Sequence, residues 1–140
     1  MILHLSLLPD LFDSFVSFSS FNVIHKLFTR FLDSKMSNNF TAMTHATGGT
    51  ILGFSYLISR NPMLYYFLKT FSTGYFLYDM NFILKKGKFD QLNLAYLYHH
   101  FASIYIINKN PVIYKGGNIL FWGELSNIPS YFVYYCIKHK

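Results

Sequence analysis

The sequence predicts an all-α protein: a polytopic helical membrane protein with about five transmembrane helices. Of the 140 residues, 52% are hydrophobic and only 13% are charged, whereas ordinary globular domains carry about 25% charged residues. Apolar stretches close to the roughly 20 residues that a helix needs to cross a bilayer recur along the chain. Short segments rich in Pro, Gly, Asn and Lys separate them. An integral, multi-pass arrangement follows from these three observations.

Four stretches have adequate length for a spanning helix. They are residues 40–58, 63–84, 92–108 and about 116–137. The segments SRNP, KKGKFDQ and NKNPVIYK lie between them and contain helix breakers. A fifth span is expected within residues 1–32, where its limits are blurred by several interrupting residues: Pro9, Asp10, Asp13, Lys26 and Arg30. Pro129 is expected to break or kink the last helix.

The net charge of +6 does not indicate a nucleic-acid-binding protein. The basic residues lie singly or in threes between apolar runs and never line a helix face. They are better interpreted as anchors in the loops of a membrane protein. Cys136 is the only cysteine, which excludes an intrachain disulfide and a cysteine metal cluster. We therefore predict no nucleic-acid partner, no cofactor and no metal site.

Ionisable residues within the predicted spans are the strongest functional signal. Each costs about 2.5–3.5 kcal/mol on membrane-insertion scales, so each needs a partner, a cavity or water. The predicted spans of His45 and Asp79 each have one end on the same side of the membrane. Both residues lie five residues from that end, at a depth of roughly 8 Å. His99 and His100 lie about 10 to 12 Å from that end. Glu124 looks deeper. Different helices therefore bring polar groups to nearly the same level.

The histidine pair also lies on a small and polar helix face. Two adjacent stripes at intervals of three and four make up this face: Asn93, Tyr96, His100 and Ser103, and Ala95, His99 and Ala102. The arrangement predicts a shared polar cavity. A plainer interpretation stays open, because a single buried His or Asp is often only a hydrogen-bonding group between helices.

Four short segments, in this order and spacing, resemble the TLC domain, which ceramide synthases share with several multi-span proteins of lipid homeostasis. They are MTHATGG at 43–49, STGYFLYDM at 72–80, YLYHHFASIY at 96–105 and GELSNIPSYF at 123–132. The resemblance implies a partial TLC-type bundle with a central polar cavity, in the endoplasmic reticulum or a related internal membrane. The residues that would line a lipid cavity are His45, Asp79, His99, His100, Glu124 and Ser126.

The departures from the family pattern refine this expectation. Ceramide synthases follow the histidines with H-D-x-x-D, whereas this chain has GELSNIP, so the likeness is to the non-synthase members. TLC domains also usually continue through further spans. We therefore expect residues 1–32 to form an amino-terminal membrane helix and linker. Residues 33–137 would form a TLC-like domain without its carboxyl-terminal spans, and residues 138–140 a basic tail.

Three functions stay open at this point. The first is binding of lipid, or influence on lipid homeostasis, with membrane lipid, sphingolipid or acyl chains as partner. The second is an acyltransferase in which His99 or His100 acts as base or nucleophile, oriented by Asp79 or Glu124. The third is a cargo or assembly factor that uses its helix surfaces. A homo-oligomer could close an incomplete cavity. Enzymatic activity is the less favoured prediction.

Overall fold

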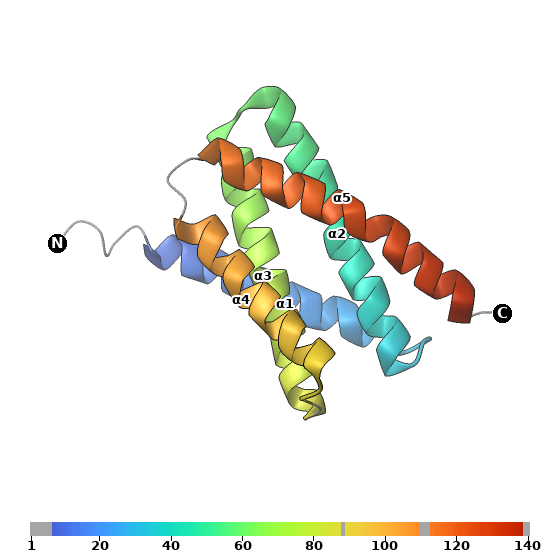
Figure 1. The fold of residues 1–140 in the computed structure, drawn as a ribbon. Helices are drawn as coiled ribbons and strands as arrows, with labels where there is room; N and C mark the ends of the chain where they lie inside the picture. The colour runs from blue at the N-terminus through green and yellow to red at the C-terminus, as the bar shows by residue number, and fades with distance from the viewer. Residues whose placement is uncertain (1–6, 88, 110–112, 139–140) are drawn as a thin grey trace.

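The computed structural model describes residues 7–87, 89–109 and 113–138, and these residues form five α-helices (Figure 1). The predicted all-α class and helix number are confirmed. Residues 1–6 and residues 139 and 140 of the predicted basic tail lie outside the described residues. The helices are α1 (Leu7–Phe28), α2 (Ser34–Ser59), α3 (Pro62–Lys86), α4 (Gln91–Lys109) and α5 (Ile113–Lys138).

Local sequence signals account for the helix ends. Asp33, Asn61 and Asp90 precede α2, α3 and α4, and each side chain accepts a hydrogen bond of 2.8–2.9 Å from a backbone N–H in the first turn. Such caps satisfy N–H groups that have no partner within the helix. Pro62 occupies the first turn of α3, where its missing N–H costs nothing. Gly87, with a φ of 63°, ends α3 in the left-handed conformation that glycine adopts without steric cost.

Pro129 was expected to break or kink the last helix, and it does not break it. The helix α5 is continuous from Ile113 to Lys138, with Pro129 in its interior. Proline removes one backbone hydrogen bond from the helix but does not forbid the helical φ angle. Pro129 is exposed, as is Leu125, whose carbonyl loses its usual partner.

The predicted membrane architecture is wrong. The five helices have 19 to 26 residues, so length is not what rules it out. Polar and charged side chains occur within every helix, for example Asp10 and Asp13 in α1 and Asn38 and Asn39 in α2. None of the helices that the structure describes is sufficiently long and apolar to cross a membrane. This contradicts the polytopic, multi-pass fold and the placement in the endoplasmic reticulum or a related internal membrane.

The third helix organises the packing. It contacts all four other helices, while α2 and α5 form a second close pair that runs side by side (Figure 1). The helix α4 packs chiefly against α3. Because α3 lies at the centre of these contacts, its side chains reach neighbours on several sides.

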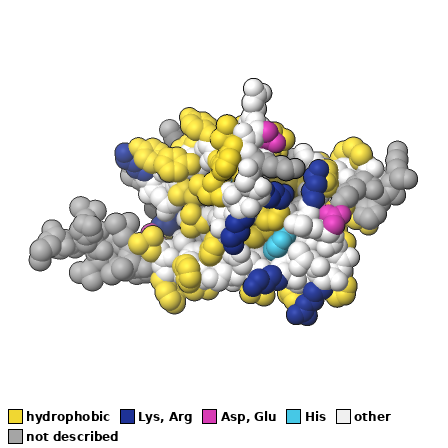
Figure 2. Space-filling view, turned by 90° about the horizontal axis from the view of Figure 1, so that it is seen from below, with side chains coloured by type: hydrophobic (Ala, Val, Ile, Leu, Met, Phe, Trp, Pro, Cys, Tyr) yellow, Lys and Arg dark blue, Asp and Glu magenta, His cyan; other side chains and the backbone are white. Residues whose placement is uncertain are grey.

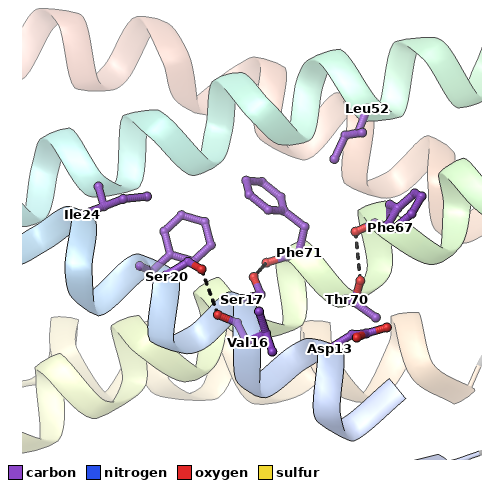
Figure 3. A pocket seen from close by; sticks show the side chains of 10 residues that line it. Asp13, Val16, Ser17, Ser20, Ile24, Leu52, Phe67, Thr70 and Phe71 are labelled. Carbon is purple, nitrogen blue, oxygen red and sulfur yellow. Dashed lines mark hydrogen bonds between the residues drawn. The ribbon is translucent and has the colours of Figure 1, made fainter. Parts of the chain in front are cut away.

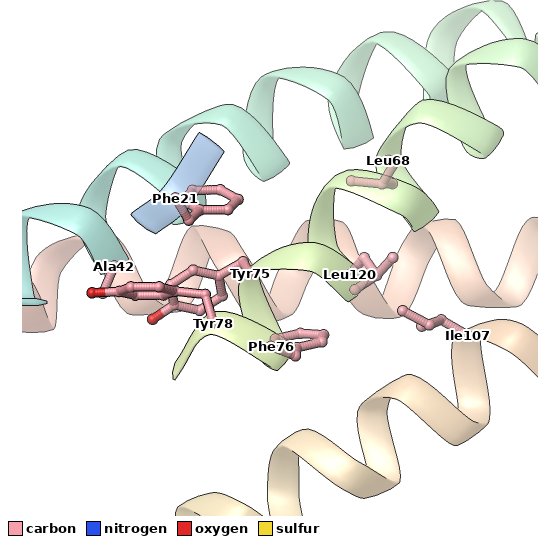
Figure 4. Close-up of a cluster of buried hydrophobic side chains, with 8 residues drawn as sticks. All are labelled: Phe21, Ala42, Leu68, Tyr75, Phe76, Tyr78, Ile107 and Leu120. Carbon is pink, nitrogen blue, oxygen red and sulfur yellow. The ribbon is translucent and has the colours of Figure 1, made fainter. Parts of the chain in front are cut away.

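An aromatic cluster forms the hydrophobic core, shown in Figure 4. Three of its members, Tyr75, Phe76 and Tyr78, follow one another closely on α3, and every other helix adds at least one side chain. The cluster comprises Phe21, Ala42, Leu68, Tyr75, Phe76, Tyr78, Ile107 and Leu120. Aromatic rings bury large areas, so this cluster contributes much of the burial that holds the bundle together.

Close approach of α1 to α3 depends on Gly74. A Cβ built on Gly74 would lie 2.4 Å from the Ser17 Cβ and 2.7 Å from the backbone nitrogen of Phe18. The Ser17 hydroxyl donates a hydrogen bond of 3.1 Å to the backbone oxygen of Phe71, so α1 is also tied to α3 by a polar contact. A backbone atom cannot move aside as a flexible side chain can. Residue 74 therefore has to be small.

We predict that Gly74→Ala lowers the free energy of unfolding by about 1 to 3 kcal/mol, because the methyl group pushes α1 off α3. The control is Gly123→Ala in α5, where an added Cβ meets nothing within 4 Å. That change should raise stability by up to about 1 kcal/mol through helix propensity alone. Chemical denaturation of both variants measures the difference, and stabilisation by Gly74→Ala would contradict the packing argument.

Candidate functional site

Four ionisable side chains, one from each of four helices, meet in the interior. His45 comes from α2, Asp79 from α3, His100 from α4 and Glu124 from α5. Their exposed fractions are only 1%, 8%, 6% and 5%. Buried ionisable groups are tolerated when they are paired and hydrogen-bonded. The four residues form two such pairs.

The first pair joins α2 to α5. The Nδ1 of His45 lies 3.3 Å from the Oε2 of Glu124, and its Nε2 lies 3.2 Å from the Ser72 hydroxyl on α3. Both ring nitrogens of His45 therefore have a partner. Gly49 makes room for the carboxylate, since a Cβ at that position would lie 3.0 Å from the Cγ of Glu124.

The second pair joins α3 to α4. The Nε2 of His100 lies 2.8 Å from the Oδ2 of Asp79. Asn38 donates a hydrogen bond of 3.2 Å to the other carboxylate oxygen and accepts one of 2.8 Å from the Tyr78 hydroxyl. The Nδ1 of His100 is buried and, within the described part of the chain, has no hydrogen-bond partner. One nitrogen of this imidazole is thus oriented by a carboxylate while the other is not engaged.

Tyr75 lies between the two pairs. Its ring stacks on His45 with 4.0 Å between centroids and 8° between planes, and it meets the His100 ring edge-on at 6.2 Å. Phe76 stacks on His100 from another side, at 5.1 Å. Tyr75 was not among the predicted site residues, although its position four residues before Asp79 places both on one helix face.

Electrostatic coupling within the cluster changes the pKa of several groups. Burial disfavours the charged form of Glu124, but the charge and hydrogen bond of His45, with a hydrogen bond from Asn127, outweigh it and hold the Glu124 pKa below its ordinary 4.5. Burial, reinforced by the neighbouring carboxylates, raises the pKa of Tyr75 well above its ordinary value and raises that of Tyr131 as well. Both phenols therefore stay neutral and available as hydrogen-bond donors.

A cavity of about 430 Å³ opens beside the second pair. Asp79 and Tyr75 belong to its lining, so the buried cluster forms part of its floor. Five aromatic rings contribute to the lining, and amides and two lysines add polar groups. The lining comprises Lys35, Asn38, Asn39, Ala42, Tyr75, Asp79, Phe82, Ile83, Lys86, Leu92, Asn93, Tyr96, Tyr131 and Tyr134. We call this space the polar cavity.

The polar cavity lies towards the end of the bundle where α2 begins and α3 ends, since Lys35 and Lys86 occupy those positions. Figure 2 views the molecule from this end. Lys and Arg side chains recur across the face, among hydrophobic side chains, with Asp or Glu side chains at a few places. Lys35 and Lys86 are the lysines that line the cavity itself.

Two of the predicted site residues lie outside the cluster. His99 is exposed, with its ring centroid 5.5 Å from that of His100. Partial shielding by its neighbours, together with the charge of His100, lowers the pKa of His99 below 6.5. Ser126 is exposed and donates its hydroxyl hydrogen bond to the backbone oxygen of Gly123, 2.7 Å away. Of the six residues, the structure brings together His45, Asp79, His100 and Glu124.

Other cavities are more apolar. Figure 3 shows a space of about 480 Å³ between α1 and α3, bordered by Leu52 of α2. Ser17 and Ser20 in its wall already donate to backbone oxygens. A further space, of about 640 Å³, is lined mainly by apolar residues of α1, α3 and α4. Asp13 borders the first space and is hydrogen-bonded by Tyr66, and Asp10 borders the second and is paired with Lys69. The Asp10–Lys69 pair is more exposed than the pair beside the polar cavity, so the polar cavity is the stronger candidate site.

The described residues contain no group of three or more His, Cys, Asp or Glu side chains that could hold a metal ion. The side chains of the candidate site have chemistry of their own. They can donate and accept hydrogen bonds, and His100, oriented by Asp79, can take or give a proton.

We predict that acid removes the stabilising effect of the Glu124 carboxylate. Its pKa is lower in the folded than in the unfolded chain, so its contribution is present above about 4.5 and is lost as the pH falls through the lower folded value. Unfolding of wild type and Glu124→Gln, followed between about pH 6 and pH 3, should show a smaller loss for the variant. Parallel curves would contradict the prediction.

A second prediction concerns the other pair. Asp79→Leu or His100→Leu leaves one ionisable side chain buried without its partner of the pair, which costs about 3 to 5 kcal/mol. The double variant removes both and should therefore cost less than the sum of the two single changes. Leu97→Ile, on the same helix as His100, is the control and should cost less than about 1.5 kcal/mol. Additive costs in chemical denaturation would mean that the two side chains do not interact.

Comparison of the chain with protein-family models, with curated proteins and with solved structures gives no match. The TLC resemblance therefore gains no support from these comparisons and stays a prediction. The candidate function rests on the site itself.

Proposed function

We propose that this protein binds a small amphipathic ligand of the lipid type in the polar cavity. The ligand's polar head would contact the amides of the lining, and its apolar part would lie against the aromatic wall. The observation that carries this proposal is one lining that combines a cavity of about 430 Å³, five aromatic rings and the buried Asp79 carboxylate, which is hydrogen-bonded to His100. Ligand sites commonly have this size and mixture.

The amides of the lining support the same proposal. Asp79 uses one oxygen for His100 and the other for Asn38, and His100 itself does not line the cavity. A polar ligand group would therefore meet the amides of Asn38, Asn39 and Asn93. Amide side chains both donate and accept hydrogen bonds, which favours a ligand with hydrogen-bonding groups at its head.

We predict that an amphipathic molecule copurifies with the wild-type protein and is largely lost from Asn93→Trp. Asn93 lines the cavity from α4, so an indole at that position fills space that the ligand needs. Tyr98→Trp is the matched control, because Tyr98 lies on the same helix, is 76% exposed and is not part of the lining. Mass spectrometry of solvent extracts of the three proteins gives the comparison.

Equal amounts of bound molecule in all three proteins would place the ligand elsewhere. Absence of any amphipathic molecule from wild type, and failure to take up an added single-chain lipid, would overturn the proposal. Circular dichroism spectra that coincide for the three proteins exclude unfolding as the cause of a loss.

Acyl transfer is a second candidate function, and one observation favours it. The 2.8 Å contact between Asp79 and the Nε2 of His100 is how a carboxylate orients an imidazole that acts as a general base. Nδ1 would then accept the proton of an amine or hydroxyl. Incubation with an acyl-CoA and a long-chain amine tests this function. A new amide formed by wild type, and not by His100→Gln, would support catalysis over binding alone.

A further inference from the structure

Two lysines stand at the entrance of the polar cavity, on different helices. Lys35 lies in the first turn of α2 and Lys86 in the last turn of α3. Both are exposed and both line the cavity. A pair of cations that converges on one opening from two helices is the arrangement that binds an anionic group.

Aromatic rings of the same lining hold these ammonium groups against the wall. The Nζ of Lys35 lies 5.3 Å from the centroid of the Tyr134 ring, and that of Lys86 lies 4.0 Å from the Phe82 ring. Cation–π contacts of this length restrict where a flexible lysine places its charge. The ordering entropy that ligand binding must overcome is correspondingly smaller.

The lining contains one carboxylate beside the two lysines. Both oxygens of that carboxylate, Asp79, are already engaged, one by Asn38 and one by His100. Lysines therefore outnumber carboxylates in the lining. Tyr75 is buried and Tyr131 is half-buried, so these two rings lie farther from solvent than the exposed lysines. Charge at the mouth and apolar rings within match a molecule that has an anion at one end and an apolar chain at the other.

We infer that the polar cavity is selective for an anionic head group, a phosphate or carboxylate, which Lys35 and Lys86 bind at the entrance. This inference rests on the proposed function and specifies its ligand. The head group could belong to an amphiphile or be a separate small anion. The experiment below distinguishes these two sources.

The test uses the full chain and isothermal titration calorimetry with three probes. They are dodecyl phosphate, the uncharged monododecanoylglycerol with the same chain length, and inorganic phosphate, with both amphiphiles below the concentration at which they form micelles. Wild type should bind dodecyl phosphate about a hundredfold more tightly than the uncharged probe, since each of the two lysines contributes roughly tenfold through a hydrogen bond to a charged group. Added salt should weaken this preference.

Lys35→Gln and Lys86→Gln should each reduce the preference by roughly tenfold, and the double variant should bind both amphiphiles alike. Lys85→Gln is the matched control, because Lys85 is exposed, precedes Lys86 in the chain and is not in the lining. An equal loss in Lys85→Gln would show that net charge alone is responsible and would overturn the inference.

The remaining outcomes separate the two proposals. Equal binding of both amphiphiles by wild type would overturn the anionic selectivity and leave the proposed function standing. Binding of neither amphiphile, with no binding of inorganic phosphate, would overturn both. Tight binding of inorganic phosphate alone, lost in the double lysine variant, would support the anion site and overturn the proposed amphipathic ligand.

Discussion

The burial of two His–carboxylate pairs is the constraint on which the rest of this structure depends. His45 with Glu124 and His100 with Asp79 place four ionisable groups in the interior of a 140-residue chain. A buried pair is tolerated only when its geometry is good and its remaining polar atoms find partners. The pairs therefore fix which faces of α2, α3, α4 and α5 point inward. The aromatic core forms around them, with Tyr75 between the two imidazoles.

Much of the fold could be predicted from the sequence, because apolar runs and helix breakers give the positions of four helices directly. The membrane prediction was wrong because it gave more weight to the hydrophobic composition of the whole chain than to the polar residues within each helix. Within the individual helices, side chains such as Asp13, Asn38 and Asn39 interrupt the apolar residues, and no described helix is apolar enough to cross a membrane. Average hydropathy therefore says less about a helix than the distribution of polar groups along it.

The site was only partly predictable. Counting residues from the helix ends placed His45, Asp79 and His100 at one level, since the helical rise is regular. The same count could not choose between His99 and His100, which lie on adjacent stripes of one face, and only the packing of α4 on α3 turns His100 inward. Lys35 and Lys86 were interpreted as loop anchors. Their place beside a cavity depends on the crossing of two helices, which periodicity does not encode.

The two pairs differ in a way that assigns them different roles. His45 is 1% exposed and both its ring nitrogens have partners, on α5 and α3, so it has no capacity left for a ligand. It fixes the register of three helices. His100 uses one nitrogen for Asp79, and Asp79 also lines the polar cavity. Removing the first pair should therefore affect the fold before it affects binding, whereas the second pair connects the fold to whatever occupies the cavity.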